Sequence, residues 1–401
     1  MGAITPVGND VATFWDSLKN GRCGIGPITK FDVSDFKVKL GAEVKDFDPT
    51  QYMEKREARR ADANVHYAMA AAIQAVEQAG LKEGNFDPYR TGVIFGSGVG
   101  GLHVAEQEVP KLLEKGPGRV SPFAIPEMIA NIAAAYISMH FGFKGENFCP
   151  VSACATGNHS IGEAMRAIRH GYQDVVVCGG TENGIIPISM AGFQNMKAVH
   201  MGEDPTAASI PFDARRSGFV MGEGAGCLVL ESLTHAQQRG ATILAEVAGY
   251  GASGDAYHIT SPSPDGDAAA HAIRGAIEDA GLTPADVDYI NAHGTSTPLN
   301  EKYETIAIKK AFGDEAYNVK VSSTKSMTGH LLGGAAAVEA IACVMAIREG
   351  IVPPTIGYKE PDPECDLDIT PNKAVEMPVN VAISNSLGFG GHNACILIKK
   401  V

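Results

Sequence analysis

One pattern of elements occurs twice along this chain. Residues 75–81 (AVEQAGL) closely match residues 276–282 (AIEDAGL), and each segment ends an amphipathic helix pattern. After each helix, a short polar loop leads into an apolar strand and then into a glycine-rich or threonine-rich run. The repeated order favours a duplication over a chance match. We therefore predict two similar α/β halves, residues 1–240 and 241–401, with a functional site where they meet.

Alternating strand-like and helix-like segments along the chain support this fold class. Buried strands are expected at 91–96, 174–179, 226–231, 287–292 and 381–385. Helices are expected at 63–80, 156–170, 267–280, 301–312 and 334–349. A chain of 401 residues is long enough to bury a substantial core around such elements.

Charge and composition exclude several classes of partner. The formal net charge of −13 argues against a general nucleic-acid binder. The longest apolar run, 335–347, is too short to insert into a membrane and contains Glu339. The 8 cysteines show no metal-binding spacing, which predicts a protein of the reducing cytoplasm. The densest positive cluster, which is either a local docking patch or a solvated helix face balanced by acids, consists of Lys55, Arg56, Arg59 and Arg60.

Cys154 is the strongest candidate for a nucleophile. It lies among the small residues of VSACATG (151–157), just before a helix pattern, whereas several other cysteines lie inside apolar runs. The positive end of a helix dipole and unpaired N–H groups favour a thiolate, which is the reactive form of cysteine. The alternative is a small buried hydrophobic residue, which is what most free cysteines are.

Two histidines of the second half lie in similarly small, polar surroundings. His293 follows a predicted strand in NAHGTSTP (291–298), and His330 lies in KSMTGHLLGG (325–334), before the long apolar helix. Ligands and catalytic groups gather at such strand ends in α/β proteins. The surroundings therefore favour a functional role for both histidines over a structural one.

These segments resemble the β-ketoacyl-acyl-carrier-protein synthases, in particular their elongating type. The resemblance rests on VSACATG, NAHGTSTP and KSMTGHLLG, together with NSLGFGGHN (385–393) and PFDARRSGFVMGEGAG (211–226), in the expected order along nearly the whole chain. It implies a thiolase-like αβαβα five-layer fold, which agrees with the duplication, and a homodimer. It also implies an acyltransferase of fatty-acid biosynthesis with an acyl carrier protein as its partner.

The family pattern assigns a role to each matching residue. Cys154 would accept a fatty acyl group, and malonyl-carrier protein would then lose carbon dioxide and attack the acyl-cysteine. His293 and His330 would donate hydrogen bonds to the negative oxygen that decarboxylation creates. The backbone N–H groups of Cys154 and Phe389 would hold the oxygen of the acyl-cysteine. Lys325 would organise the charges of the site, paired with a glutamate, either Glu304 or Glu339.

Further positions are carried over for the substrates. Thr295 and Thr297 would bind the pantetheine arm, and Phe389 would gate the site on a loop made mobile by Gly388, Gly390 and Gly391. The acyl tail would run past Val99, Phe193 and the region 129–135, with the partner subunit contributing. Apart from the resemblance, the positive cluster itself makes Arg59 and Arg60 candidates for binding the carrier protein. No metal or organic cofactor is implied for the reaction, although some members hold a structural monovalent cation at positions that match Asn291, Glu339, Ser384 and Asn385.

Other readings make different predictions. A thiolase acting on coenzyme A would carry a second cysteine where this chain has Phe389, and an initiating synthase would carry asparagine in place of His330. A polyketide-type ketosynthase shares these motifs and is not excluded by them. A cysteine hydrolase, from a different class, leaves the duplicated architecture unexplained.

The chain departs from the family pattern at its beginning. Family members carry a hydrophobic strand before GAITPVG, whereas this sequence starts with Met1 at that point. We expect the absent stretch to be a central strand of the first sheet, so that the sequence lacks part of its start and folds poorly without it.

Overall fold

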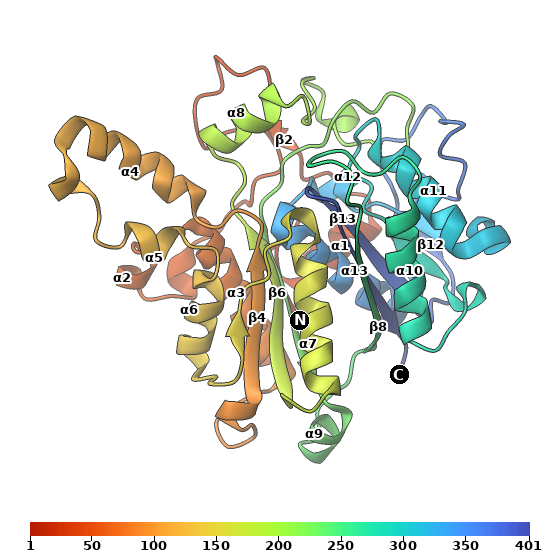
Figure 1. Ribbon diagram of the computed structural model, residues 1–401, viewed down its shortest axis with the longest axis horizontal. Coiled ribbons are helices and arrows are strands. Elements are labelled where there is room, and N and C mark those ends of the chain that lie inside the picture. The colour runs from red at the N-terminus through yellow and green to blue at the C-terminus, as the bar shows by residue number, and fades with distance from the viewer.

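Two five-stranded sheets form the framework of the protein (Figure 1). The structure is a computed structural model that describes residues 1–401. In order across the first sheet, the strands are β1 (Gly2–Ile4), β7 (Gly224–Glu231), β6 (Val175–Glu182), β4 (Thr91–Ser97) and β5 (Asn147–Phe148). Across the second sheet they are β8 (Glu246–Gly254), β14 (His392–Lys399), β13 (Val381–Gly388), β9 (Tyr289–Asn291) and β10 (Lys320–Ser322).

The two sheets have the same topology. When the five strands of each sheet are numbered along the chain, both sheets have the order 1-5-4-2-3. In both, the fifth strand is antiparallel to its two neighbours, while the fourth, second and third strands are parallel. A shared order with one reversed strand is a specific pattern, and it confirms the duplicated α/β fold that the sequence predicted.

Helices form three layers around the two sheets (Figure 1). The middle layer, between the sheets, contains α7 (Thr156–Arg169) from the first half and α13 (Ala335–Glu349) from the second. The outer face of the first sheet is covered by α3 (Ala63–Ala79) and α6 (Ile132–Phe141), and that of the second by α10 (Asp267–Asp279) and α11 (Asn300–Phe312). This is the expected αβαβα arrangement of five layers.

In the middle layer α13 is buried almost throughout, because its residues are small or apolar on all sides. Twelve of the fifteen residues of α13 are buried, and alanine is the commonest of them. Where α7 crosses it, a Cβ on Gly157 would lie 2.8 Å from the backbone nitrogen of Ala337. Only glycine allows this approach, which brings the first turn of α7 against the first turn of α13.

The remaining elements connect the layers or lie at their ends. The helices are α1 (Val11–Lys19), α2 (Lys55–Ala58), α4 (Leu102–Lys115), α5 (Ala124–Met128), α8 (Pro187–Asn195), α9 (Leu233–Gln238) and α12 (Lys325–Thr328). Two small hairpin-like pairs are β2 (Gly26–Pro27) with β3 (Leu40–Gly41), and β11 (Ile351–Val352) with β12 (Val375–Glu376). Figure 1 shows α4 and α5 projecting away from the body of the molecule.

The position expected for the first strand is wrong. β1 is an edge strand that pairs only with β7, from Gly2 opposite Cys227 to Ile4 opposite Ala225. Its counterpart β8 also lies at an edge and pairs with β14 along eight residues. The first strand of the chain therefore lies at the edge of the first sheet and not at its centre. Beside the part of β7 that β1 leaves uncovered lies a cavity of about 510 Å³, lined by Met1 and by residues 228–233 and 241–247, among others.

None of the helices combines the length and the apolar content that crossing a bilayer requires.

Candidate active site

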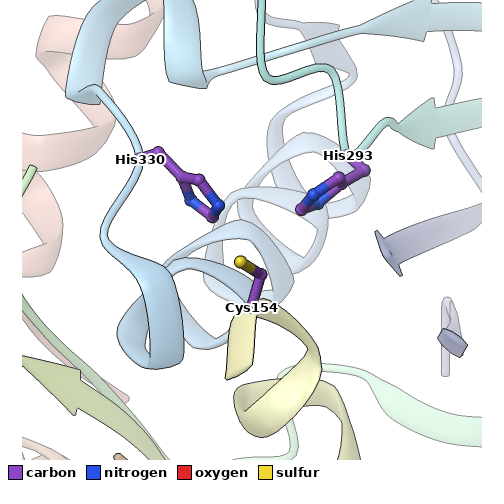
Figure 2. Close-up of side chains that lie close together, drawn as sticks. All are labelled: Cys154, His293 and His330. Carbon is purple, nitrogen blue, oxygen red and sulfur yellow. The ribbon is translucent and has the colours of Figure 1, made fainter. Parts of the chain in front are cut away.

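The strand-to-helix connection before α7 places Cys154 at the centre of the molecule. Cys154 lies in a 3-10 turn (Ala153–Ala155), and the backbone N–H of Ser152 donates to the hydroxyl of Thr156 at 2.9 Å across the turn. Ala153 has a φ of +50°, which is a strained conformation for a residue other than glycine. The tight turn directs the thiol away from α7 and towards the second half of the chain (Figure 2).

In the resting protein, burial keeps the side chain of Cys154 protonated as a thiol. Removal from water raises the pKa of Cys154 to about 12, although the charge of Lys325 and a hydrogen bond from the N–H of Phe389 act in the opposite direction. The sequence predicted that the helix N-terminus would favour the thiolate. That effect is outweighed here, so the proton of the thiol has to be removed during a reaction.

His293 and His330 face the thiol from the second half, as predicted (Figure 2). Their rings meet edge to face with centroids 5.4 Å apart. A ring nitrogen of each histidine and the sulfur of Cys154 all lie within 4.8 Å of one another. His293 follows β9, and His330 follows α12. Cys154 and the two histidines, which lie more than 130 positions after it in the sequence, therefore form one cluster of three side chains.

Both histidines are neutral near pH 7. Burial lowers the pKa of His293 and of His330 well below the usual value, and the charge of Lys325 acts in the same direction. A neutral imidazole carries one N–H donor and one unprotonated nitrogen. Because the Nδ1 atoms of both rings lack hydrogen-bond partners, the fold does not dictate which nitrogen carries the proton. The pair therefore offers both a donor and a proton acceptor to the sulfur.

The backbone of each histidine is held separately. The carboxylate of Glu304 accepts hydrogen bonds from the N–H groups of His293 at 2.7 Å and Gly294 at 2.8 Å. The N–H of His330 donates to the carbonyl of Val220 at 2.7 Å, in a short β-bridge with the first half. These contacts fix both rings relative to the thiol.

Lys325 is fully buried, and its ammonium group forms an ion pair with Glu339. Of the two partners that the sequence offered, Glu339 is therefore the one that pairs. Burial raises the pKa of Glu339 to about 7, against the opposing effect of Lys325. The charge of Lys325 adds to the effect of burial, which lowers the pKa of both histidines and holds their rings neutral.

The loop between β13 and β14 forms one wall of the site. Gly390 and Gly391 have φ values of +88° and +76°, and a Cβ on Gly388 would lie 2.6 Å from the carbonyl oxygen of Ser152. The N–H groups of Phe389 and Cys154 both point at the sulfur, an arrangement that can hold a carbonyl oxygen bound there. The ring centroids of Phe389 and Phe193 lie 6.3 Å apart.

A contact that the sequence analysis missed ties this loop to its neighbour. The side-chain amide of Asn393 donates to the carboxylate of Asp255 at 2.6 Å, and the N–H of Gly390 donates to the carbonyl of Ile259 at 2.8 Å. These residues are more than 130 positions apart, and no local pattern marks them. The sequence offered only one signal, the polar and proline-rich composition of residues 255–265.

A cavity of about 540 Å³ connects these groups. Of the residues that the sequence predicted for catalysis and substrate binding, its lining contains Cys154, His293, His330, Phe389, Thr295, Thr297, Phe193 and Val99. The hydroxyl groups of Thr295 and Thr297 lie 3.0 Å apart. Arg59 and Arg60 lie elsewhere, at and just beyond the end of α2, and the region 129–135 does not line this cavity.

The residues predicted for a monovalent cation are all buried. Ser384 pairs with Asn291 across β13 and β9, and Asn385 follows it. One side-chain oxygen each of Asn291, Glu339 and Asn385 is buried without a hydrogen-bond donor. Oxygens without donors are the groups that a hard cation binds, so these residues fit such an ion.

Comparisons with known proteins agree with this geometry. Residues 1–236 match the family model "Beta-ketoacyl synthase, N-terminal domain", and residues 244–359 match "Beta-ketoacyl synthase, C-terminal domain". The chain is 53% identical over 401 residues to a Synechocystis protein named 3-oxoacyl-[acyl-carrier-protein] synthase 2, covering 100% of this chain and 96% of the relative. It is 49% identical over 400 residues to a Staphylococcus aureus (strain N315) protein of the same name, covering 100% and 97%.

Solved structures share the whole fold. An ishigamide ketosynthase/chain length factor superposes with a TM-score of 0.93 at 38% identity, covering 100% of this chain and 97% of the other. A β-ketoacyl synthase from Burkholderia phymatum gives a TM-score of 0.92 at 32% identity, with 100% and 98% covered. A ketosynthase in complex with its type II polyketide acyl-carrier protein gives 0.93 at 33% identity, again with 100% and 98% covered.

Proposed function

Because this chain belongs to the β-ketoacyl synthase family, we propose that it condenses malonyl-carrier protein with a cysteine-bound fatty acyl group in chain elongation. The products are a 3-oxoacyl-carrier protein two carbons longer, carbon dioxide and free carrier protein. The observation that carries the proposal is the buried cluster of Cys154, His293 and His330 on the wall of one cavity. The acyl group stays on Cys154 while the first carrier protein leaves and malonyl-carrier protein enters, so the reaction is of the ping-pong type.

In the first half-reaction, the sulfur of Cys154 attacks the carbonyl carbon of the acyl thioester. A neutral histidine accepts the thiol proton, which a thiol with so high a pKa does not release to water at neutral pH. The N–H groups of Cys154 and Phe389 stabilise the oxyanion. The bond to the carrier sulfur then breaks, and the proton passes to the departing thiolate.

In the second half-reaction, the malonyl group loses its carboxylate. The electron pair of the breaking C–C bond moves onto the thioester, and the oxygen that becomes negative accepts hydrogen bonds from His293 and His330. The resulting carbanion attacks the acyl-cysteine carbonyl, and the C–S bond to Cys154 breaks. The released thiolate takes a proton from solvent. We propose no metal or organic cofactor for these steps, because the departing carbon dioxide leaves the electron pair behind.

The decisive experiment offers acyl-carrier proteins of graded chain length together with malonyl-carrier protein and measures product masses. A single two-carbon 3-oxo extension is expected. Repeated extension without reduction would indicate a polyketide-type ketosynthase, and a free fatty acid would indicate a hydrolase. Transfer to coenzyme A in place of the carrier protein would indicate the thiolase-like reaction.

The carrier protein is proposed to dock on the positive cluster of the first half. Lys55, Arg56 and Arg59 are exposed, and none of these or Arg60 forms an ion pair within the chain. The guanidinium of Arg60 lies 4.5 Å from the centre of the Phe123 ring. Four unpaired cations on a chain with a net charge of −13 form a local attractive site for an acidic partner.

A homodimer is proposed from the free edge of the first sheet. β5 leaves one edge without a partner, and Phe148 is 42% exposed there, beside Met139 at 67% and Val151 at 56%. An unpaired, apolar strand edge favours pairing with another strand, and a two-fold axis allows a second copy to supply it. Sedimentation velocity should show a dimer that Phe148→Asp disrupts, while the control Leu233→Asp, at an exposed apolar residue on α9, leaves it intact. A monomeric wild-type protein would contradict this proposal.

We propose that the buried oxygens of Asn291, Glu339 and Asn385 bind a structural monovalent cation. Replacing sodium and potassium with a bulky organic cation should then lower the melting temperature.

We also propose a cytoplasmic location, because all eight cysteines are free thiols. Cell fractionation tests the location, and recovery outside the cytoplasm would contradict it.

A further inference from the structure

Glu182, at the end of β6, is a buried carboxylate that the proposed steps do not use. It is 1% exposed and has no cationic partner. Its oxygen Oε1 accepts from the hydroxyl of Ser97 at 2.8 Å and from the N–H of Val99 at 3.3 Å. Its oxygen Oε2 accepts from the N–H groups of Gly98 at 2.8 Å and Gly333 at 3.0 Å.

These four donors come from two segments that line the acyl cavity. Gly98 and Val99 follow β4, and Gly333 lies in the 3-10 turn Leu332–Gly334, three residues after His330. Gly98, Val99 and Leu332 all line the cavity that contains Cys154. The space around the carboxylate is tight, because a Cβ on Gly98 would lie 2.7 Å from Oε2 of Glu182. Glu182 therefore supports the cavity wall from behind.

The second half of the chain contains a similar arrangement, in which a buried glutamate accepts hydrogen bonds from consecutive backbone N–H groups. There, Glu304 accepts from two consecutive N–H groups, of His293 and Gly294, in the segment that follows β9. β4 and β9 are the second strands of their sheets, so each glutamate holds the segment that follows the second strand, although Glu182 ends β6 and Glu304 lies on α11. One glutamate thus holds the histidine side of the site, and the other holds the acyl side.

We propose that Glu182 is a positioning residue for the acyl-transfer half-reaction, which fixes the Gly98–Val99 wall so that an acyl tail is aligned with Cys154. The inference rests on the proposed function, since it concerns the path of the acyl group. Glu182 itself does not contact the substrate and acts only through the wall that it holds. Its effect should grow with the length of the acyl chain, because a longer tail makes more contacts with the wall.

The isosteric variant Glu182→Gln separates the two sides of this contact. Its amide oxygen is needed by the N–H groups of Gly98 and Gly333, so the new NH2 group faces Ser97 and Val99. The Ser97 hydroxyl can rotate to accept from it, whereas the N–H of Val99 loses its acceptor. One buried donor is left unpaired, at the cavity wall and not at the histidine side.

The test measures each half-reaction by itself. Acylation of Cys154 by carrier proteins of graded length is followed by rapid quench and intact-protein mass, and malonyl decarboxylation is followed in the Cys154→Gln background. Glu182→Gln should lower kcat/KM of acylation about 10-fold for long chains and less than about 3-fold for short ones. Decarboxylation should stay within about 2-fold of the parent.

The matched control is Glu223→Gln. Glu223 is equally buried, pairs with Lys30 and accepts from the N–H of Val44 at 2.9 Å, and it does not line the cavity. It should leave the chain-length dependence unchanged. A similar change in this control, a loss that is equal at all chain lengths, or an equal loss in decarboxylation would overturn the proposal.

A folding failure of Glu182→Gln does not prevent the test. Ser97→Ala removes one of the four donors and also the acceptor of the Gly100 N–H, and it keeps the carboxylate. It should produce the same chain-length dependence with a smaller factor, about 3-fold for long chains. Unchanged acylation at every chain length in Ser97→Ala would then overturn the proposal. Wild-type protein that transfers no acyl group at all would instead refute the proposed function.

Discussion

Removal of one histidine donor should slow decarboxylation without abolishing it. We consider His293→Leu and His330→Leu, which keep much of the ring volume and remove the N–H, in the Cys154→Gln background where no acyl group can be loaded. Loss of one donor aimed at a developing oxyanion costs roughly 2.7–4 kcal/mol of barrier. At about 1.36 kcal/mol per factor of ten, this predicts a rate about 100- to 900-fold lower in each single variant.

The structure predicts how the two losses combine. His293 is 3% exposed and His330 is 2% exposed. The centroids of the two rings are 5.4 Å apart, and both rings face the sulfur of Cys154. Two donors on one oxygen are not independent, because the first loss already changes the transition state that the second would stabilise. The double variant should therefore fall by about 1,000- to 10,000-fold, less than the product of the single effects.

The assay is release of labelled carbon dioxide from malonyl-carrier protein at saturating substrate. Circular dichroism and melting temperature serve as controls for folding, because each ring also packs in the core of the site. Decarboxylation within about 3-fold of the parent in either single variant would refute the donor role of that histidine. Strictly multiplicative losses would refute the idea that both act on one atom.

Four further predictions concern the nucleophile, the docking charges, the protonation of the histidines and metal binding. Cys154→Ala should abolish acyl transfer, measured as the mass gain of the protein, because no other thiol lines the cavity. Charge reversal at Arg59 and Arg60 should raise KM for the carrier protein more at low salt than at high salt, since screening weakens exposed charges. Because the folded pKa values of His293 and His330 lie below the unfolded value, the unfolded state binds more protons below about pH 6.5. Falling pH should then destabilise the wild type relative to the double leucine variant, by up to about 1.4 kcal/mol per pH unit for each histidine, measured by denaturant unfolding. Zinc should inhibit reversibly by binding the sulfur and both rings, and a chelator should restore activity.

Each of these has an outcome that contradicts it. Retained acylation in Cys154→Ala would remove it as the nucleophile, and a salt-independent effect at Arg59 and Arg60 would remove them from the docking face. Parallel stability curves for wild type and the double variant would show that the histidines titrate normally. Zinc binding that is equally tight in Cys154→Ala, measured by calorimetry, would place the metal elsewhere.

Features with a local cause were predictable from the sequence. Helix boundaries followed from apolar periodicity, so α3, α7 and α13 begin and end within one residue of their expected limits. Cys154, His293 and His330 were recognisable because small and polar neighbours surround them. The family pattern added Phe389 and Lys325, whose places in the cavity wall and beside the histidines no local signal revealed.

Features that depend on packing were not predictable in the same way. The helix N-terminus at Cys154 is a local property, whereas the burial that outweighs it depends on the other half of the chain. Likewise, Glu182 meets Gly333 across 151 positions, and nothing near either residue indicates the contact. The position of β1 was misjudged because strand order is set by pairing, which hydrophobicity does not encode.

The shared middle layer makes the two halves depend on each other. α7 and α13 cover the inner faces of the two sheets and also pack against each other, so neither half can bury its inner surface alone. A single half would need a second copy to cover that surface, and the duplicated chain supplies this copy within itself. The chemistry follows the same division, because the sulfur comes from one half and the two imidazoles come from the other.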